Sequence, residues 1–519
     1  MNLILRPSLK PYPEISLPEV LAGSAKRFQN KIAAVYGSQT ITFGELSTRC
    51  NGTALRLVAS GLKPGERVAL MGQNSIDYIA AFFGILKAGG VVVPFSPAYT
   101  AREISAQLRD SDPSAVIIDP DFGETFMTSS GGLISSDRVV WMGSSSAAEA
   151  TSLADVHPPP EKIAFSTLHP DRIAVIAYSS GTTGVPKGVM LSHRNLVSNL
   201  IQFRHQDPVP ITGADIFLNH LPFFHIYGMN VLMSEAISVG ATQVIMRRFD
   251  PDELVNLIAR HRATLLFTVP PVVLTLVKNL PRLRQRNLSS LRYVNTGAAP
   301  LPPEVAREFR RLTGVPVKQG YGLTETSPTT NADFYANPDH ESVGPPVADT
   351  EERVVDVQDW RNVLAPGEVG ELLVRGPQIM QGYWRDPELT ERVLTDGWFH
   401  TGDLARMDER GYVFIVGRTK EMIKYKGYTV APNELEALLL EHPEVKDCAV
   451  AGVPDREAGE IPKAFVVLKP GSTADGEALM DFLRTRVAGY KRVRQIELVD
   501  AIPRSVSGKI LRRLLTQKS

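Results

Sequence analysis

The chain has 519 residues, and its 56 lysines and arginines equal its 56 aspartates and glutamates, so the formal net charge is zero. This balance excludes an overall basic field, and we expect no nucleic-acid partner. The length favours two or more domains, and the 43% hydrophobic and 22% charged fractions are typical of a globular protein. Two cysteines, Cys50 and Cys448, are too few for a disulfide framework or a cysteine-based metal site, which favours a reducing, cytoplasmic setting.

The N-terminal end and the longest apolar stretch are both poor candidates for membrane segments. Residues 1–19 contain scattered prolines and charges and no apolar core, so we expect no secretory signal. Residues 78–96 are interrupted by Lys87, by two glycines and by Pro94. These breaks predict a helix that ends near Gly89 and a strand over 91–93, which is a unit of a folded core and not a transmembrane segment.

Short β-branched runs alternate with longer amphipathic segments from about residue 30 to 330, which predicts parallel sheets in an α/β architecture. The predicted strands are 67–71, 115–118, 173–177, 243–246 and 264–268. The predicted helices are 43–60, 75–88, 250–260, 271–279 and 303–312. The first helix follows Thr42, a suitable N-cap, with Glu45 three residues later as in a capping box.

A polar loop, residues 178–188, follows the predicted strand 173–177. Its hydroxyls, its glycines and Lys187 offer hydrogen bonds, close backbone approach and positive charge, which together suit a phosphate. It is not a P-loop, because the spacing differs and Pro186 prevents a helix from starting there. An ordinary Ser/Thr/Gly surface loop stays open as the alternative. A helix is predicted to begin after Ser192, a good N-cap.

Two more segments offer groups that suit a nucleotide. In the segment 319–326, a ring such as that of Tyr321 can cover a planar base, and Thr324 with Glu325 can hold Mg²⁺ on a phosphate. A half-buried aromatic residue is the ordinary alternative. Asp403 follows an aromatic run and can accept both hydroxyls of a ribose, although an Asx turn explains it equally well.

Two single residues are weaker candidates. His225 lies in the apolar segment 221–228, where a hydrogen-bonded core histidine is the more common case. Lys509 lies in the polar turn 503–510, and most such lysines are solvated surface residues. Neither residue identifies a catalytic group on its own.

The character of the chain changes near residue 340. Short strands bounded by glycine, at 354–355, 370–376 and 412–416, predict a β-rich subdomain. The last hundred residues form a small α+β unit of their own, with helices over 434–442 and 477–487. We place the boundary between residues 417 and 421, which gives an N-terminal domain of residues 1–419 and a C-terminal domain of residues 420–519.

Taken in this order, the clusters resemble the adenylate-forming superfamily, which includes acyl-CoA synthetases, peptide-synthetase adenylation domains and beetle luciferases. The resemblance runs from about residue 20 to 515. It is carried by the loop 178–188 and by the segments 297–301, 320–325, 401–403, 417–421 and 507–509. Three further segments, 224–227, 424–428 and 430–432, are most similar to 4-coumarate–CoA ligases and their fatty-acyl relatives.

The resemblance implies an α/β fold: a large N-terminal domain of parallel-sheet αβ subdomains plus a β-rich subdomain, followed by a small mobile α+β C-terminal domain. It also implies an ATP-dependent carboxylic acid–CoA ligase. Such an enzyme forms acyl-AMP and pyrophosphate, and then acyl-CoA and AMP. ATP, Mg²⁺ and coenzyme A are the implied cofactor and co-substrates, and a monomer or homodimer is expected.

The resemblance also assigns roles to individual residues. The implied ATP- or AMP-binding residues are Ser179, Ser180, Gly181, Thr182, Thr183, Lys187, Ala298, Gln319, Gly320, Tyr321, Thr324, Asp403, Arg418 and Lys509. The implied acyl pocket consists of His225, Tyr227, Val231, Ala298, Gly320, Gly322, Pro328 and Thr329. The implied coenzyme A contacts are Arg248, Lys424, Lys426 and Gly427. Lys420 is the implied hinge, and Glu325 is the implied magnesium ligand. The implied catalytic residues are Lys509, His225, Thr324 and Glu325.

Three departures from the coumarate-ligase pattern bear on the substrate. Gly417 stands where those ligases usually carry Asp, Val231 where they often have a small hydroxyl residue, and Thr329 where an aliphatic residue is common. The last two positions line the implied acyl pocket, so a fatty acid or another arylalkanoate suits the chain as well as a hydroxycinnamate. Transfer of the acyl group to a carrier protein, luciferase-like oxygenation and a non-catalytic nucleotide-binding scaffold stay open as alternatives.

Overall fold

The computed structural model describes residues 6–135, 138–143, 168–179, 186–279, 287–426, 428–504 and 510–516. Within these residues the chain builds two parallel-type sheets with helices, one antiparallel sheet and a separate C-terminal sheet. The predicted α/β class, with a large N-terminal part and a smaller C-terminal part, is confirmed.

The first large sheet has the strand order β14-β13-β12-β11-β9-β10-β1-β2. Neighbouring strands run parallel from β13 to β1, whereas β14 and β2 are antiparallel to their neighbours. Its strands are β1 (Ile32–Tyr36), β2 (Gln39–Thr42), β9 (Ile216–Asn219), β10 (Thr242–Ile245), β11 (Leu265–Thr268), β12 (Tyr293–Thr296), β13 (Val317–Gly322) and β14 (Thr329–Ala332). The predicted nucleotide segment forms the end of β13 and the turn after it.

The second large sheet has the strand order β17-β8-β7-β4-β3-β5-β6. The strands from β7 to β6 run parallel, and β8 and β17 are antiparallel additions. Its strands are β3 (Arg67–Met71), β4 (Val91–Phe95), β5 (Ala115–Ile118), β6 (Val139–Trp141), β7 (Ile173–Ser179), β8 (Lys187–Ser192) and β17 (Gly382–Tyr383). The predicted phosphate loop connects β7 to β8.

Helices follow most strands of both sheets, as the alternating pattern predicts. They are α1 (Leu17–Arg27), α2 (Phe43–Ala59), α3 (Ile76–Lys87), α4 (Ala101–Ser111), α5 (Gly123–Ser130), α6 (His193–Arg204), α7 (Glu235–Val239), α8 (Pro251–His261), α9 (Pro270–Lys278), α11 (Pro303–Thr313) and α12 (Pro387–Val393). α2 and α3 pack closely because Gly84 of α3 has no side chain: a Cβ there would lie 2.4 Å from Thr53 of α2. In the described part of the chain, no helix has the length and apolarity needed to cross a bilayer.

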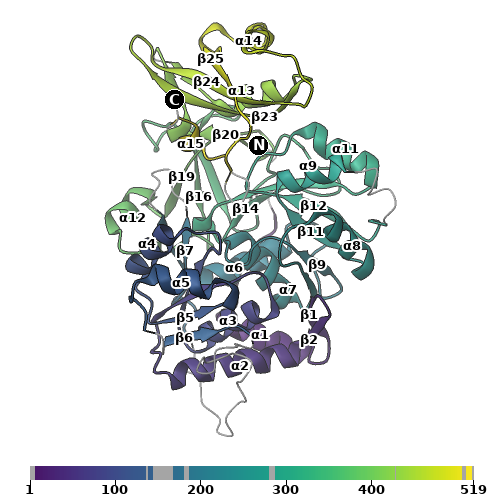
Figure 1. Cartoon of the computed structure of the whole chain (residues 1–519), viewed down its shortest axis with the longest axis vertical. Coiled ribbons are helices and arrows are strands. Elements are labelled where there is room, and N and C mark those ends of the chain that lie inside the picture. Colours follow the sequence, from purple (N-terminus) through teal and green to yellow (C-terminus); the bar gives the residue numbers. More distant parts are fainter. Residues whose placement is uncertain are drawn as a thin grey trace.

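Two smaller sheets complete the fold. The antiparallel one has the order β15-β16-β19-β18, with β20 also paired to β19. Its strands are β15 (Glu351–Val355), β16 (Gly370–Arg375), β18 (Leu394–Thr395), β19 (Trp398–Met407) and β20 (Val413–Arg418). The C-terminal sheet consists of β21 (Ile423–Tyr425), β22 (Tyr428–Val430), β23 (Val445–Asp455), β24 (Gly459–Leu468) and β25 (Gln495–Leu498), accompanied by α13 (Pro432–Leu440), α14 (Gly476–Arg484) and α15 (Arg512–Thr516). Figure 1 shows this C-terminal unit at the top of the molecule, above β19 and β20.

Local sequence signals predicted several helix starts correctly. Thr42 and Glu45 form the expected capping box of α2, and Ser192 accepts the backbone N–H of Asn195 at the start of α6. Two features were not predicted. β4 continues through Pro94, and all five residues of this strand are buried. Residues Tyr227–Ser234 form a π-helical segment, η4, that leads into α7.

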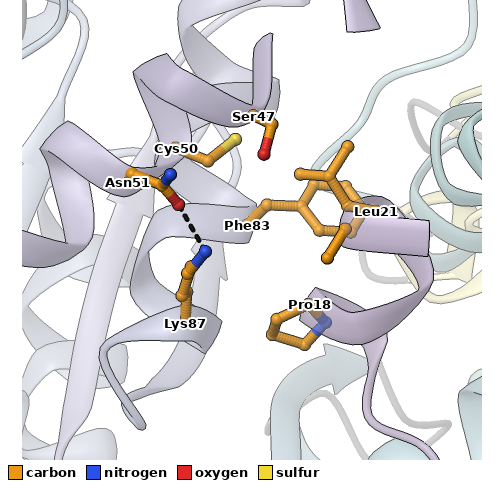
Figure 2. A pocket seen from close by; sticks show the side chains of 8 residues that line it. Pro18, Leu21, Ser47, Cys50, Asn51, Phe83 and Lys87 are labelled. Carbon is orange, nitrogen blue, oxygen red and sulfur yellow. Dashed lines mark hydrogen bonds between the residues drawn. The ribbon is translucent and has the colours of Figure 1, made fainter. Parts of the chain in front are cut away.

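A small cavity lies where α1, α2 and α3 meet (Figure 2). Lys87 at the end of α3 donates a hydrogen bond to the side-chain oxygen of Asn51 across this space. The cavity volume is about 10 Å³, which is room for one water molecule at most. It is therefore a packing feature and cannot take a substrate.

Charged groups are buried behind β13, next to the predicted nucleotide site. Lys318 is completely buried and its ammonium donates to the Asp207 carboxylate, to Gln206 Oε1 at 3.2 Å and to the Asp333 carbonyl at 2.9 Å. Three acceptors offset the cost of removing this ammonium from water. The strand that carries the Gly320-Tyr321-Gly322 segment is thereby tied to the segment that follows α6.

Arg6 ties the N-terminal segment to the same region. Its guanidinium donates to the backbone carbonyls of Gln206, Ala332, Pro345 and Pro346 at 2.6–3.0 Å. Glu352 on β15 lies near this guanidinium: its Oε2 accepts from the Asn331 amide at 2.9 Å, and its buried Oε1 has no partner among the described residues. Burial raises the pKa of Glu352 to about 8, despite Asn331 and the charge of Arg6.

Glu352→Gln should alter how stability depends on pH. The folded-state pKa of Glu352 is raised, so between about pH 4.5 and 8 the folded protein keeps a proton that the unfolded chain has released. The contribution of this group to the free energy of unfolding is therefore lost as the pH rises through that window. The variant, which cannot ionise, should match the wild type near pH 5 and melt at a higher temperature near pH 8. Thermal unfolding from pH 5 to 8 measures this.

Glu351→Gln is the matched control, because the neighbouring Glu351 side chain is exposed and pairs with Arg375 on the surface. Its melting temperature should track the wild type at every pH. Equal pH profiles for Glu352→Gln and the wild type would contradict the assignment.

Candidate active site

Three predicted nucleotide-binding residues meet around one buried carboxylate. Asp403 of β19 lies opposite Arg418 of β20 in the antiparallel pair. Arg418 Nε donates to Asp403 Oδ1 at 2.5 Å, and the Tyr321 hydroxyl donates to Oδ2 at 2.5 Å. Asp403 is only 4% exposed, so these donors offset the burial of its charge. The end of β13 is thereby joined to the hairpin that precedes the predicted hinge.

Tyr321 presents a neutral phenol and a ring flanked by two glycines. Burial, followed by the charge of Asp403, raises its pKa well above the ordinary value, so the hydroxyl stays protonated and donates. Gly322 has no alternative at its position, because a Cβ there would lie 1.9 Å from the Pro328 carbonyl oxygen. The segment that carries the Tyr321 ring therefore packs directly against the backbone at Pro328.

A second carboxylate, Glu325, lies in the short 3₁₀ turn η5 (Thr324–Thr326) directly after β13. Its Oε1 accepts from the Tyr383 hydroxyl at 3.0 Å and from Ser179 Oγ at 3.4 Å. The Lys187 ammonium lies 5.4 Å from the centre of the Tyr383 ring. Residues from β7, β8, β17 and η5 thus gather a carboxylate, hydroxyls and a cation at one place.

The donor set at this place suits a metal ion that is held mainly by phosphate. Mg²⁺ in nucleotide sites usually takes one or two protein carboxylates and fills its remaining positions with phosphate oxygens and water. Glu325 supplies one carboxylate, and among the residues that the structure describes there is no group of three or more His, Cys, Asp or Glu side chains that could hold a metal. Glu325 therefore fits a Mg²⁺ ion that arrives with ATP, and it does not form a protein-only metal site.

Two lysines from different segments are close enough to repel each other. Burial lowers the pKa of Lys187, and the charge of Lys420 lowers it further. Lys420 lies in the 3₁₀ turn η6 (Thr419–Glu421), between β20 and the C-terminal sheet. Like charges held together raise the local positive potential, which favours an anion such as a polyphosphate.

The β7–β8 hairpin is anchored from outside the site. Tyr178, at the entrance of the predicted phosphate loop, donates its hydroxyl to the Asp110 carboxylate at the end of α4. The Trp384 indole N–H donates to the Asp110 carbonyl at 3.0 Å, and Gly188 provides the space under Trp384. Asp110, Tyr383 and Trp384 were missed in the sequence, because their partners lie 58 to 274 positions away along the chain.

The buried side-chain amide of Asn74, which follows β3, holds the segment around His225 in place. Asn74 accepts the Phe223 N–H and donates to the Leu221 carbonyl, both at 2.8 Å. His225 Nδ1 faces the Tyr227 N–H at 3.2 Å, which places the ring proton on Nε2. Burial lowers the pKa of His225 to about 4, so near neutral pH the ring is an uncharged donor.

The remaining predicted acyl-pocket residues come from η4 and from the β13–β14 turn. Tyr227 opens η4 and Val231, which is 1% exposed, follows one turn later. Thr329 pairs with Gly322 across β13 and β14, directly after Pro328. π-Helical segments occur often at functional sites, because the extra residue redirects side chains.

Ala298 lies in the turn between β12 and α11, and Gln319 lies in the middle of β13. Ala298 is exposed and adopts a positive φ of 70°. The Gln319 side chain is buried; it accepts the Leu301 N–H at 2.9 Å and donates to the His340 carbonyl at 2.7 Å. Gln319 therefore fixes the position of the turn that contains Ala298.

Three of the predicted coenzyme A residues, Arg248, Lys424 and Lys426, are basic and exposed, and they come from distant segments of the chain. Arg248 is exposed after β10, next to Arg247, which bonds to Asp119 and Asp121. Lys424 lies on β21, and Lys426 turns the chain between β21 and β22 with a φ of 47°. The Arg494 guanidinium lies 4.9 Å above the Tyr425 ring, which adds a further cation beside this hairpin.

Arg512 anchors the C-terminal segment near the predicted hinge. It donates to Glu421 at 2.7 Å, to both oxygens of Glu436 at 2.8 and 2.9 Å, to Asn433 at 2.9 Å and to the Val450 carbonyl at 2.9 Å. The remaining predicted residues Ser180, Gly181, Thr182, Thr183, Gly427 and Lys509 lie outside the described residues, and their placement stays a prediction.

Comparison with known proteins shows which family the chain belongs to. The family model "AMP-binding enzyme" matches residues 21–384, and the model "AMP-binding enzyme C-terminal domain" matches residues 434–509. The chain is an AMP-binding enzyme. The predicted membership of the adenylate-forming superfamily is confirmed, because the first match alone covers most of the chain.

Relatives of this AMP-binding enzyme include two groups of ligases. It is 35% identical to a long-chain-fatty-acid–CoA ligase of Bacillus subtilis (strain 168), over 98% of this chain and 95% of the relative. It is 39% identical to 4-coumarate–CoA ligase-like 9 of Oryza sativa subsp. japonica, over 96% of this chain and 92% of the relative.

Two solved structures with the same fold contain ATP or an acyl-AMP. ATP-bound MatB from Rhodopseudomonas palustris superposes on this AMP-binding enzyme with a TM-score of 0.86 and 30% identity, covering 97% of this chain and 99% of MatB. The anthranilate CoA ligase AuaEII in complex with anthranoyl-AMP gives a TM-score of 0.88 at 26% identity, covering 97% of both chains.

Gly322→Ala should destabilise the enzyme, whereas Gly297→Ala should be tolerated. The added Cβ at residue 322 meets a backbone oxygen at 1.9 Å, and a forced shift of this kind costs on the order of 1–3 kcal/mol. At residue 297 the nearest atom is 3.5 Å away, an ordinary contact. Thermal unfolding of both variants measures the difference, and equal melting temperatures would contradict the packing of Gly322 against Pro328.

Proposed function

We propose that the protein is an ATP-dependent carboxylic acid–CoA ligase that works in two steps. The observation that carries the proposal is the convergence of Tyr321, Asp403 and Arg418 beside Glu325 and Lys187. The groups that we assign to the base, the ribose and the phosphates of ATP are thus gathered in one region. The named relatives, which are CoA ligases, support a thiol as the final acceptor.

In the first step, an oxygen of the substrate carboxylate forms a bond to the α-phosphorus of ATP. The bond between that phosphorus and the pyrophosphate oxygen breaks, and pyrophosphate leaves with the electron pair. Both reactants are anions, so cations and donors must offset their repulsion and the charge that develops on phosphorus. A bound Mg²⁺ ion would supply part of this neutralisation.

The chain's own residues divide the work of this step. Glu325 would hold the magnesium ion, Thr324 and the loop 179–187 the phosphates, and Asp403 the ribose hydroxyls. His225, as an uncharged Nε2 donor, suits an oxygen of the substrate carboxylate. Lys509 would bridge the ribose and the carboxylate and stabilise the transition state.

In the second step, the sulfur of coenzyme A attacks the acyl carbon and AMP leaves. We propose that the C-terminal domain, residues 420–519, rotates at Lys420 against the N-terminal domain, residues 1–419. The rotation withdraws Lys509 and brings Lys424, Lys426 and Gly427 to the site, so that one pocket serves two reactions. Arg248 on the large domain would meet the phosphates of coenzyme A.

The proposal includes the setting of the enzyme. Its partners are small molecules, namely a fatty or arylalkanoic acid, ATP and coenzyme A, without nucleic acid. We expect a monomer or homodimer in the cytoplasm.

Lys509→Ala should abolish most of the first step. Loss of one positioned charge in such a transition state commonly costs about 10²–10³ in rate. The measurement is pyrophosphate release over a panel of aryl, medium-chain and long-chain acids, with and without coenzyme A. Release should require an acid, and thioester should form only when coenzyme A is present.

Lys446→Ala is the matched control, since Lys446 is an exposed lysine on β23 of the same domain. It should behave as the wild type. Pyrophosphate release without thioester would reject coenzyme A as the acceptor, and no release with any acid would reject the ligase assignment.

Charge reversal at the β21–β22 hairpin should separate the two steps. The double variant Lys424→Glu, Lys426→Glu should form acyl-AMP at the wild-type rate and raise the KM for coenzyme A about tenfold or more, equivalent to about 1.4 kcal/mol. Single-turnover pyrophosphate release and steady-state thioester formation measure the two effects. An unchanged KM for coenzyme A would remove this hairpin from its binding site.

A further inference from the structure

One tyrosine hydroxyl bonds to the carboxylate that we assign to magnesium. The Tyr383 hydroxyl donates to Glu325 Oε1 at 3.0 Å, and Ser179 Oγ donates to the same oxygen at 3.4 Å. Both donors use Oε1, and in the part of the chain that the structure describes Oε2 has no hydrogen-bond partner. A carboxylate oxygen without a protein donor keeps its lone pairs for a metal ion.

The hydroxyl of Tyr383 is not needed to fill space. Tyr383 is only 7% exposed, and its ring belongs to the same apolar cluster as Val189 and Met380. A phenylalanine ring would fill nearly the same volume. Among the described residues the hydroxyl bonds only to Glu325, so it acts on the carboxylate and not on the core.

The backbone around Tyr383 is itself fixed. Tyr383 pairs with Val189 across β17 and β8, and its N–H donates to Thr390 Oγ1 at 2.9 Å. Three residues earlier, the Met380 N–H donates to the Glu325 carbonyl at 2.8 Å. One short segment, residues 380–383, thus holds both the main chain and the side chain of Glu325, which gives the carboxylate a defined orientation.

The ring of Tyr383 also lies near a predicted phosphate-binding cation. The Lys187 ammonium is 5.4 Å from the ring centre, a distance at which a cation is attracted to an aromatic face. Lys187 pairs with Ser179 across β7 and β8, and both residues are half-buried, so solvent reaches the side chains beside the carboxylate. Tyr383 therefore contacts the two kinds of group that a magnesium–triphosphate complex needs, a carboxylate and a cation.

We propose that Tyr383 is a positioning residue that orients Glu325 for a magnesium ion bound with ATP. The inference rests on the ligase activity proposed above and adds a residue to its first step. Side chains that hydrogen-bond to a metal-binding carboxylate orient it, and their loss commonly weakens metal binding about 10- to 100-fold. A phenol suits this task, because an ionised carboxylate only accepts hydrogen bonds and the phenol supplies a donor.

The test measures the Kd for ATP by isothermal titration calorimetry in the absence of any acid, once with Mg²⁺ and once with EDTA. The wild type should bind ATP more tightly with Mg²⁺. Tyr383→Phe keeps the ring and removes the hydroxyl, so it should weaken ATP binding about tenfold or more in Mg²⁺ and leave binding in EDTA unchanged. In a Glu325→Gln background the same change should have no further effect, because the hydroxyl acts through the carboxylate.

Tyr12→Phe is the matched control. The Tyr12 hydroxyl also donates to a carboxylate, Asp349 Oδ2, at 2.8 Å, and neither residue belongs to the nucleotide, metal or acyl site proposed above. Its Kd for ATP should equal that of the wild type in Mg²⁺ and in EDTA.

The outcomes separate this inference from the proposed activity. Equal ATP binding by Tyr383→Phe and the wild type in Mg²⁺ would overturn the role of the hydroxyl. Equal weakening in Mg²⁺ and in EDTA would also overturn it, because the hydroxyl would then serve only the fold. Either result leaves the ligase assignment intact if the wild type releases pyrophosphate with an acid. No release by the wild type with any acid would reject the proposed function, and this inference with it.

Discussion

The geometry of the site depends on the Asp403 carboxylate. Its two oxygens take hydrogen bonds from Tyr321 and Arg418, which belong to different sheets. Each hydrogen bond to a charged group contributes about 1.5–3 kcal/mol. Without them the end of β13 would lose its connection to the β19–β20 hairpin, and a buried charge would lack partners. One side chain therefore keeps Tyr321, at the predicted base site, and Arg418, two residues before the predicted hinge, in fixed relative positions.

Much of the remaining site is positioned by side chains that form hydrogen bonds with backbone groups far away in the sequence. Asn74 holds the turn before His225, and Gln319 holds the turn that contains Ala298. Arg6 joins backbone carbonyls from three segments of the large domain. Amides and guanidinium groups suit this task because each presents several donors or acceptors in a fixed plane. Irregular turns can then be as well ordered as strands, which a site built from loop residues requires.

The sequence predicted what is encoded locally. The caps at Thr42 and Ser192, the α/β alternation and the superfamily motifs were all identified, and the fold class and the family are confirmed. The π-helical segment η4 was not, because its residues are as apolar as those of an α-helix. Tyr383, Asp110 and Trp384 were not found either, since each acts through a partner that is remote in the chain. The roles of the motif residues, including Lys509 and the loop 180–185, stay predictions.

Arg512 has a consequence for how a moving domain could be built. All its partners, Glu421, Asn433, Glu436 and Val450, follow Lys420 in the chain, whereas the Asp403–Arg418 pair precedes it. Ion pairs thus hold the structure together on both sides of Lys420. If the two parts rotate at Lys420, the Arg512 contacts would move with the part after Lys420 and the Asp403–Arg418 pair with the part before it. The barrier to rotation would then come from backbone torsion and not from rupture of these ion pairs. Each part would then move as a rigid body up to Lys420 itself.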